Sequence, residues 1–307
     1  MVFQPFLIYV IIFYSPPNLK TLKYVLLNTS FFQISHALLA FLTQFRQVSN
    51  LSPIQIWSYG PCRYFEACVC YMMYHGLQTS AMISTLSAFF TIYMKYDASQ
   101  YVTPSRRRIM SVGFFLCGVV LVSVSCEIIL IFIQSLPVET REYYKVLNQN
   151  VTEYANIGIV DIWGVLPSTI NYIIINSLVL IVPMAASYMR KKVASKITPT
   201  IDHVSEAKRR QSNIFLNGLT IQVVLPLLLY VPIFMCQVIT VITKKEVILQ
   251  QYLIFVLPNV STVLDPIISL IFVMPYRRQI IIWLGLDKDE TVAKEIRAQT
   301  PSVFVMT

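Results

Sequence analysis

Four polar side chains recur at helical spacing in an otherwise apolar stretch of the chain, and their chemistry is suited to binding a small molecule. They are Tyr71, Tyr74, His75 and Gln78. Residues three or four apart share one face of a helix, so this stripe could line a pocket with hydrogen-bond donors and acceptors. The same stripe could instead form a hydrogen-bonded seam between two helices. The sequence leaves both interpretations open.

Further polar side chains that could face this stripe occur in three later apolar stretches. Asn171 and Tyr172 lie in one of them, and Gln237 and Tyr252 lie in the next two. None of these side chains identifies a ligand by its chemistry. The sequence predicts a ligand site formed by these residues: Tyr71, Tyr74, His75, Gln78, Tyr172, Gln237 and Tyr252.

Two carboxyl groups stand alone in long apolar stretches. Glu127 is the only charge in residues 109–136, and Asp265 is the only one in residues 249–274. An ionisable group inside a bilayer is costly, which makes each a functional candidate. Glu127 could be a neutral carboxyl that is hydrogen-bonded to a neighbour, or it could contact a ligand.

Prolines interrupt the last two apolar stretches. Pro266 follows Asp265, and a proline removes a helical hydrogen bond that a nearby polar side chain can replace. This pair predicts either a hinge or a simple packing kink. With Pro226 and Pro232 in the preceding stretch, we predict a switch region made of Pro226, Pro232, Asp265 and Pro266.

The chain lacks the motifs of several functional classes. His36, His75 and His203 lie on different elements without a second ligand at metal spacing, and no phosphate-binding loop or nucleophile elbow occurs. The last apolar stretch has no Lys for a retinal Schiff base. We therefore expect a non-enzyme with no catalytic residues, no metal site and no cofactor.

The composition indicates the kind of protein that holds these residues. Of 307 residues, 56% are hydrophobic and 13% are charged, whereas soluble domains carry about 25% charged residues. This argues against a soluble enzyme or a disordered chain. The net charge of +9 is typical of basic loops at a membrane rather than of nucleic-acid binding.

Apolar stretches of about 20 residues predict membrane-spanning helices. The predicted fold is an all-α, polytopic membrane protein with a seven-helix bundle. The spans cover about residues 2–14, 22–45, 64–94, 109–136, 168–189, 213–242 and 249–274. The first is shorter than a bilayer requires. It could be a stub supported by its neighbours, the remainder of a span with upstream residues missing, or a signal peptide.

The basic residues predict the orientation of the spans. With the N-terminus outside, the inner segments hold 18 of the 24 Lys and Arg residues, as the positive-inside rule expects. Asn50 and Asn150 begin glycosylation sequons in predicted outer loops. We expect both to be glycosylated.

The inner segment 190–212 holds seven basic residues against two acidic ones. It could anchor the chain to anionic lipid or contact an acidic partner. Residues 276–286 mix basic and apolar side chains with a Trp and predict a surface helix. Residues 287–307 form a predicted cytoplasmic tail, so the receptor-like domain would cover residues 1–286. The predicted coupling residues are Arg190, Lys191, Lys192, Lys208, Arg209 and Arg210.

Several motifs resemble those of the nematode serpentine receptors, most closely class delta (Srd), over nearly the whole chain. They are residues 59–64 (YGPCRY), residues 219–226 (LTIQVVLP), residues 266–277 and residues 19–21 (LKT). The resemblance implies a rhodopsin-like seven-helix receptor of sensory neurons, in the plasma membrane of a sensory cilium. It also implies an unknown small-molecule ligand and a heterotrimeric G protein as partners.

The chain departs from the family in its short first span, which is full-length in family members, and from other seven-helix receptors in two further features. It has no Arg from Phe65 to Met94, where rhodopsin-like receptors carry an Asp/Glu-Arg-Tyr signature, and segment 137–167 has no Cys to pair with Cys62. A bond from Cys62 to Cys68 or Cys70 stays open. The alternatives to a chemoreceptor are a small-solute transporter or channel, which would predict an internal repeat, and a non-functional truncated relative.

Overall fold

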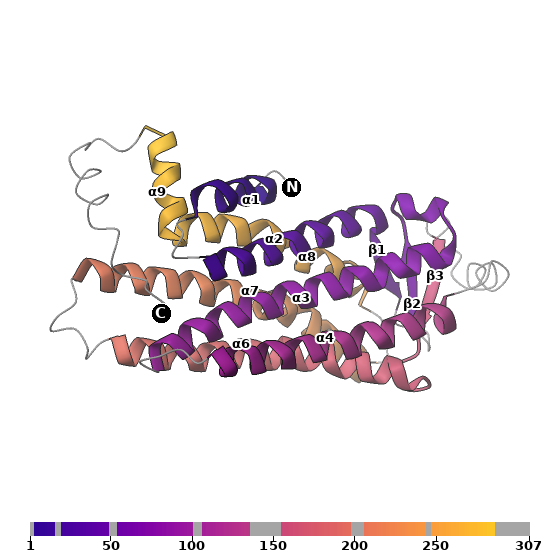
Figure 1. Ribbon diagram of the computed structural model, residues 1–307. Coiled ribbons are helices and arrows are strands. Elements are labelled where there is room, and N and C mark those ends of the chain that lie inside the picture. The colour runs from indigo at the N-terminus through magenta and orange to yellow at the C-terminus, as the bar shows by residue number, and fades with distance from the viewer. Residues whose placement is uncertain are drawn as a thin grey trace.

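Long helices make up most of the protein. The computed structural model describes residues 3–15, 20–48, 54–100, 106–135, 155–197, 206–243 and 247–285. The helices are α1 (Phe3–Tyr14), α2 (Lys20–Thr43), α3 (Ala67–Gln100), α4 (Arg106–Gln134), α6 (Leu166–Ile197), α7 (Glu206–Thr243), α8 (Ile248–Phe272) and α9 (Met274–Trp283). The long helices run side by side, with α9 at one end and a small sheet at the other (Figure 1).

Four of the described helices are long and apolar enough to cross a membrane. They are the segments Leu22–Thr43 of α2, Arg106–Gln134 of α4, Leu166–Val193 of α6 and Ile248–Phe272 of α8. Each coincides with a predicted span. Helices α1, α3 and α7 lie at the other three predicted spans, and α1 is a shorter apolar helix.

Helix α3 lies in the centre of the molecule. It packs against α2, α4, α6 and α7 and against strand β3. His75, Ser80 and Thr91 are buried on it. These polar side chains are surrounded by protein. Ser80 and Thr91 donate to carbonyl oxygens of α3 itself, those of Leu77 and Ser87.

The structure corrects the prediction of an all-α fold, because three strands form a sheet at the end of the bundle predicted to be outside. They are β1 (Phe45–Val48), β2 (Ile54–Ser58) and β3 (Ala155–Val160). The order is β1-β2-β3 and both pairings are antiparallel, with an irregularity between Ile56 and Trp57. A short 3-10 helix, Pro61–Tyr64, leads from β2 into α3. The chain is therefore mostly helical rather than all-α.

Helices α6 and α7 extend into the segment that was predicted as the basic inner loop. α6 continues to Ile197 and α7 begins at Glu206, so much of segment 190–212 is helical. The predicted glycosylation sites Asn50 and Asn150 and the predicted tail 287–307 lie outside the described residues.

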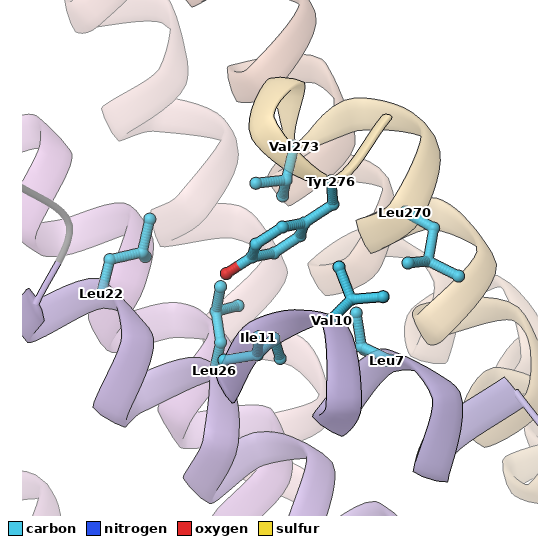
Figure 2. Close-up of a cluster of buried hydrophobic side chains, with 8 residues drawn as sticks. All are labelled: Leu7, Val10, Ile11, Leu22, Leu26, Leu270, Val273 and Tyr276. Atoms are coloured by element: carbon cyan, nitrogen blue, oxygen red, sulfur yellow. The ribbon is translucent and has the colours of Figure 1, made fainter. Parts of the chain in front are cut away.

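At the end of the bundle predicted to be inside, α1 and α9 pack against α8. Leu7, Val10 and Ile11 of α1 pack with residues of α2, α8 and α9 in a buried apolar cluster, and the Tyr276 ring inserts among them (Figure 2). The Tyr276 hydroxyl lies 2.8 Å from Ser15 Oγ. Burial raises the pKa of Tyr276, and the hydrogen bond to Ser15 opposes the rise. The predicted surface helix 276–286 thus corresponds to α9, which packs on α1.

Candidate functional site

The polar stripe on α3 forms the centre of an aromatic cluster beneath the sheet. The rings of Tyr71 and Tyr74 stack with centroids 5.7 Å apart, and His75 meets Tyr71 edge-on at 4.7 Å. Gln78 Nε2 donates to the Tyr74 hydroxyl at 2.9 Å. The structure therefore brings together all four stripe residues.

Tyr71 attaches the sheet to the bundle. Its hydroxyl donates to the carbonyl oxygen of Ile159 in β3 at 2.6 Å, and the side chain is fully buried. A side chain at Gly158 would collide with the Tyr71 ring. This residue supports the seam interpretation, because its polar group bonds the protein's own backbone.

Tyr74 contacts the two aromatic residues that border a pocket. Its ring lies 5.1 Å from that of Phe45 in β1 and 6.1 Å from that of Phe255 in α8. The pocket has a volume of about 300 Å³ and lies between the outer parts of α2 and α8. Its lining is Ala40, Thr43, Gln44, Phe45, Tyr59, Leu77, Tyr252, Phe255, Val256 and Asn259.

The pocket contains one of the predicted site residues, Tyr252. The guanidinium of Arg46 lies 5.1 Å from the centre of the Tyr252 ring, and Arg46 Nε donates to Gln251 Oε1. This arrangement places a cation against the ring of a lining residue, while Arg46 itself does not line the pocket. The pocket could hold an apolar molecule of modest size.

Two of the predicted ligand-site residues, Tyr172 and Gln237, are not seen in the aromatic cluster. Tyr172 is 38% exposed on α6, whereas its neighbour Asn171 is buried and accepts a hydrogen bond from Ser123 Oγ of α4 at 2.5 Å. The side chain of Gln237 lies outside the described residues. Asn171 thus takes the inward position on α6.

The half of the bundle predicted to be inner contains a buried polar network around Asp265. The Gln33 amide donates to Asp265 Oδ2 and accepts from the Gln4 amide. Gln222 Nε2 donates to the Asp265 backbone oxygen at 3.1 Å and to Ser269 Oγ at 2.8 Å. The network therefore joins α1, α2, α7 and α8.

The predicted switch prolines differ in how close they lie to this network and in how buried they are. Pro266 is buried beside Asp265 on α8, while Pro232 is exposed on α7. Pro226 lies within α7, and its side chain is outside the described part of the chain. The sequence analysis missed Gln4, Gln33 and Gln222. Gln33 carried a usable signal, because it is an amide within a predicted span.

The surface predicted to be inner presents basic side chains at several helix ends. Arg190 Nη2 donates to Asn217 Oδ1 at 2.9 Å, and Lys191 and Lys192 are exposed. Arg108 of α4 forms an ion pair with the buried Asp97 of α3 at 2.9 Å. The side chains of three other predicted coupling residues, in α7, lie outside those described: Lys208, Arg209 and Arg210.

No disulfide joins Cys62 to Cys68 or Cys70 in the structure. Cys70 Sγ instead donates to the Cys62 carbonyl oxygen. Among the described residues, no three His, Cys, Asp or Glu side chains gather in a group that could hold a metal ion.

Comparison with known proteins gives a consistent result. The model of the family "Serpentine type 7TM GPCR chemoreceptor Srd" matches residues 1–282. Serpentine receptor class delta-44 of Caenorhabditis elegans is 45% identical over 99% of this chain and 93% of that receptor. Class delta-40 and class delta-47, from the same organism, are 38% and 40% identical over 94% and 93% of this chain and 90% of each relative. No solved structure matches the chain significantly.

Proposed function

Because the chain belongs to the Srd family of serpentine seven-transmembrane chemoreceptors, we propose that it is a chemosensory G-protein-coupled receptor for a small molecule. It is an integral membrane protein. In this proposal residues 1–286 form one receptor domain in which α1, α2, α3, α4, α6, α7 and α8 all cross the membrane of a sensory cilium, in a rhodopsin-like arrangement. Residues 287–307 form the cytoplasmic tail.

The ligand binds in the outer half of the bundle, beneath the sheet. The observation that carries this proposal is the pocket beside Tyr252, whose border residues Phe45 and Phe255 contact Tyr74 of the α3 stripe. A ligand there meets apolar rings and a few polar groups, which is the usual composition of a small-molecule site. The proposed contacts remain the seven predicted residues: Tyr71, Tyr74, His75, Gln78, Tyr172, Gln237 and Tyr252.

Helix α8 connects this pocket to the inner network. Tyr252 and Phe255 line the pocket, and Asp265 and Pro266 lie further along the same helix. A ligand that binds one arrangement of α8 better than another shifts the population toward it. The hydrogen bonds of Asp265 to α2 and of Gln222 to α8 would then rearrange, with Pro226, Pro232 and Pro266 allowing the helices to bend.

The basic inner ends of α6 and α7 carry the signal to a G protein. Helix α3 contains no Arg, so the positive charge for an acidic partner comes from other helices. The exposed Lys191 and Lys192 supply part of it on α6. The full proposed set is Arg190, Lys191, Lys192, Lys208, Arg209 and Arg210.

A reporter assay tests the proposal. Cells that express the full chain and a calcium reporter are exposed to a panel of small volatile and water-soluble compounds. We expect at least one compound to signal above mock-transfected cells. Replacing Phe255 with Ala should raise the half-maximal concentration of that compound about tenfold, or about 1.4 kcal/mol, because a half-buried ring that lines the pocket is lost.

The control is Phe115→Ala, which alters an exposed side chain on α4 outside the pocket lining and should leave the response unchanged. A receptor that reaches the cell surface but answers no compound contradicts the proposal. Solute flux through liposomes that contain the purified chain and no G protein would instead favour a transporter or channel.

A further inference from the structure

Two buried ionisable side chains in the outer half of the bundle have polar atoms without a hydrogen-bond partner among the described residues. Glu127 of α4 is 4% exposed and His75 of α3 is 3% exposed. Oε2 of Glu127 accepts from Thr79 Oγ1, but Oε1 has no partner. Neither ring nitrogen of His75 forms a hydrogen bond of normal geometry, although the Gln78 amide interacts with the ring. Such orphaned groups are uncommon and call for a missing partner.

Both side chains belong to one polar region. His75 and Thr79 lie one helical turn apart on α3, and Thr79 bonds Glu127 directly. The Ser123 and Asn171 side chains lie beside the carboxyl. The region therefore joins α3, α4 and α6 through polar side chains.

The charge of this region is unbalanced. No described basic side chain pairs with Glu127, and a carboxylate away from water is unfavourable without a cation. One turn before Thr79 on α3, the His75 ring meets the Tyr74 ring at 5.1 Å. A carboxylate next to aromatic rings has the chemistry that binds an ammonium group, since the ring faces also attract cations.

We propose that Glu127 and His75 form an amine-binding subsite, in which the Glu127 carboxylate binds the protonated amine of the ligand and a ring nitrogen of His75 hydrogen-bonds a second polar group on it. The inference rests on the proposed function, because it names the ligand class of the same outer site. The apolar body of the ligand packs on Tyr74, which also contacts Phe45 and Phe255 at the pocket.

The experiment measures the melting temperature of the purified full chain in detergent with paired probes. Each aryl or alkyl ethanolamine, such as phenylethanolamine, is compared with the glycol in which a hydroxyl replaces the amine. We expect ethanolamines to raise the melting temperature and the glycols to leave it unchanged. Glu127→Gln should abolish the rise, because the amide still accepts from Thr79 but has no charge. Glu66→Gln, at an exposed position, should retain the rise.

His75→Phe is the second variant, and it keeps an aromatic ring. It should weaken binding of the ethanolamines several-fold while leaving simple amines without a hydroxyl unaffected. The proposal is overturned if no ethanolamine exceeds its glycol, or if Glu127→Gln keeps the full rise. If the amine subsite is overturned in this way but the receptor still signals in response to neutral compounds, the proposed function is still supported. Amine binding that depends on Glu127 but never signals supports the subsite and contradicts the receptor function.

Discussion

The outer and inner halves of the bundle are held together by different chemistry. In the outer half, aromatic rings on α3 support a sheet through close ring packing and a hydrogen bond to its backbone. In the inner half, the Gln33 amide, the Asp265 carboxyl and the Gln222 amide bond across helices. Packed rings have few alternative partners, whereas amides and carboxyls can exchange theirs.

This difference assigns each half its role in the proposed receptor. Interlocked rings give a site of fixed shape, as recognition requires. Asp265 Oδ1 has no hydrogen-bond partner among the described residues, so the inner network has a free acceptor available for a rearranged state. We infer that the outer half recognises and the inner half switches.

The largest expected effect comes from overpacking the outer cluster. Gly158→Ala places a methyl group against the Tyr71 ring, and such overpacking costs typically about 1–3 kcal/mol. We expect a clear fall in the melting temperature of the detergent-solubilised receptor. Gly118→Ala is the matched control, because no atom lies near its added methyl group. It should stabilise α4 by up to about 1 kcal/mol. Equal effects of the two substitutions would contradict the close packing at the sheet.

A somewhat smaller loss is expected from the inner network. Gln33→Leu leaves the Asp265 carboxyl without a described hydrogen-bond partner, while the Gln4 amide keeps its bond to the Thr262 carbonyl oxygen. This should destabilise the protein by about 2 kcal/mol. The double variant Gln33→Leu, Asp265→Leu removes both partners and should recover part of that loss. Thermal unfolding of the single and double variants measures the coupling. Strictly additive losses would show that the two side chains are not bonded.

Loosening the sheet without disturbing the ring packing should have a smaller effect. Tyr71→Phe removes the hydrogen bond to Ile159 and keeps the ring, at a cost of about 1 kcal/mol. We expect faster proteolysis of the β3 region and a slightly lower melting temperature. Tyr188→Phe, at an exposed position on α6, should change neither measurement, and a similar effect there would argue against a specific anchor at Tyr71.

The smallest effect on stability is expected at the inner surface. Lys191 and Lys192 are exposed, and neutralising them as Lys191→Gln, Lys192→Gln should alter the free energy of unfolding by less than about 0.5 kcal/mol. The proposed coupling role predicts a weaker reporter response at unchanged surface expression. An unchanged response would remove these two lysines from the coupling surface.

The positions of the helices follow from composition, but the sheet does not. Apolar stretches identified α2, α4, α6 and α8 because a lipid-facing helix must be apolar along its length. Strand β2 is only five residues long, and it pairs with β3 about 100 residues later in the chain. No local sequence pattern predicts such a pairing, because the strands are stabilised by contacts between residues far apart in the chain.

The site residues were predicted correctly where helical spacing alone places them on one face of a helix. The prediction failed where the sequence did not show which face of the helix points inward. Tyr71, Tyr74, His75 and Gln78 share a face by their spacing alone. On α6, a step of one residue turns the side chain by about 100°, which is why buried Asn171 replaces Tyr172 at the inward position. Gln33 and Asp265 are 232 residues apart, so their pairing depended on the fold.

The orientation of the bundle is the claim on which both roles depend, and cysteine labelling on intact cells tests it most directly. Trp163 is exposed between β3 and α6, and Leu284 is exposed just after α9. A membrane-impermeant maleimide should label Trp163→Cys on intact cells above the level of the parental receptor. It should label Leu284→Cys only after the cells are permeabilised. Labelling of Leu284→Cys on intact cells, with Trp163→Cys protected, would contradict the account.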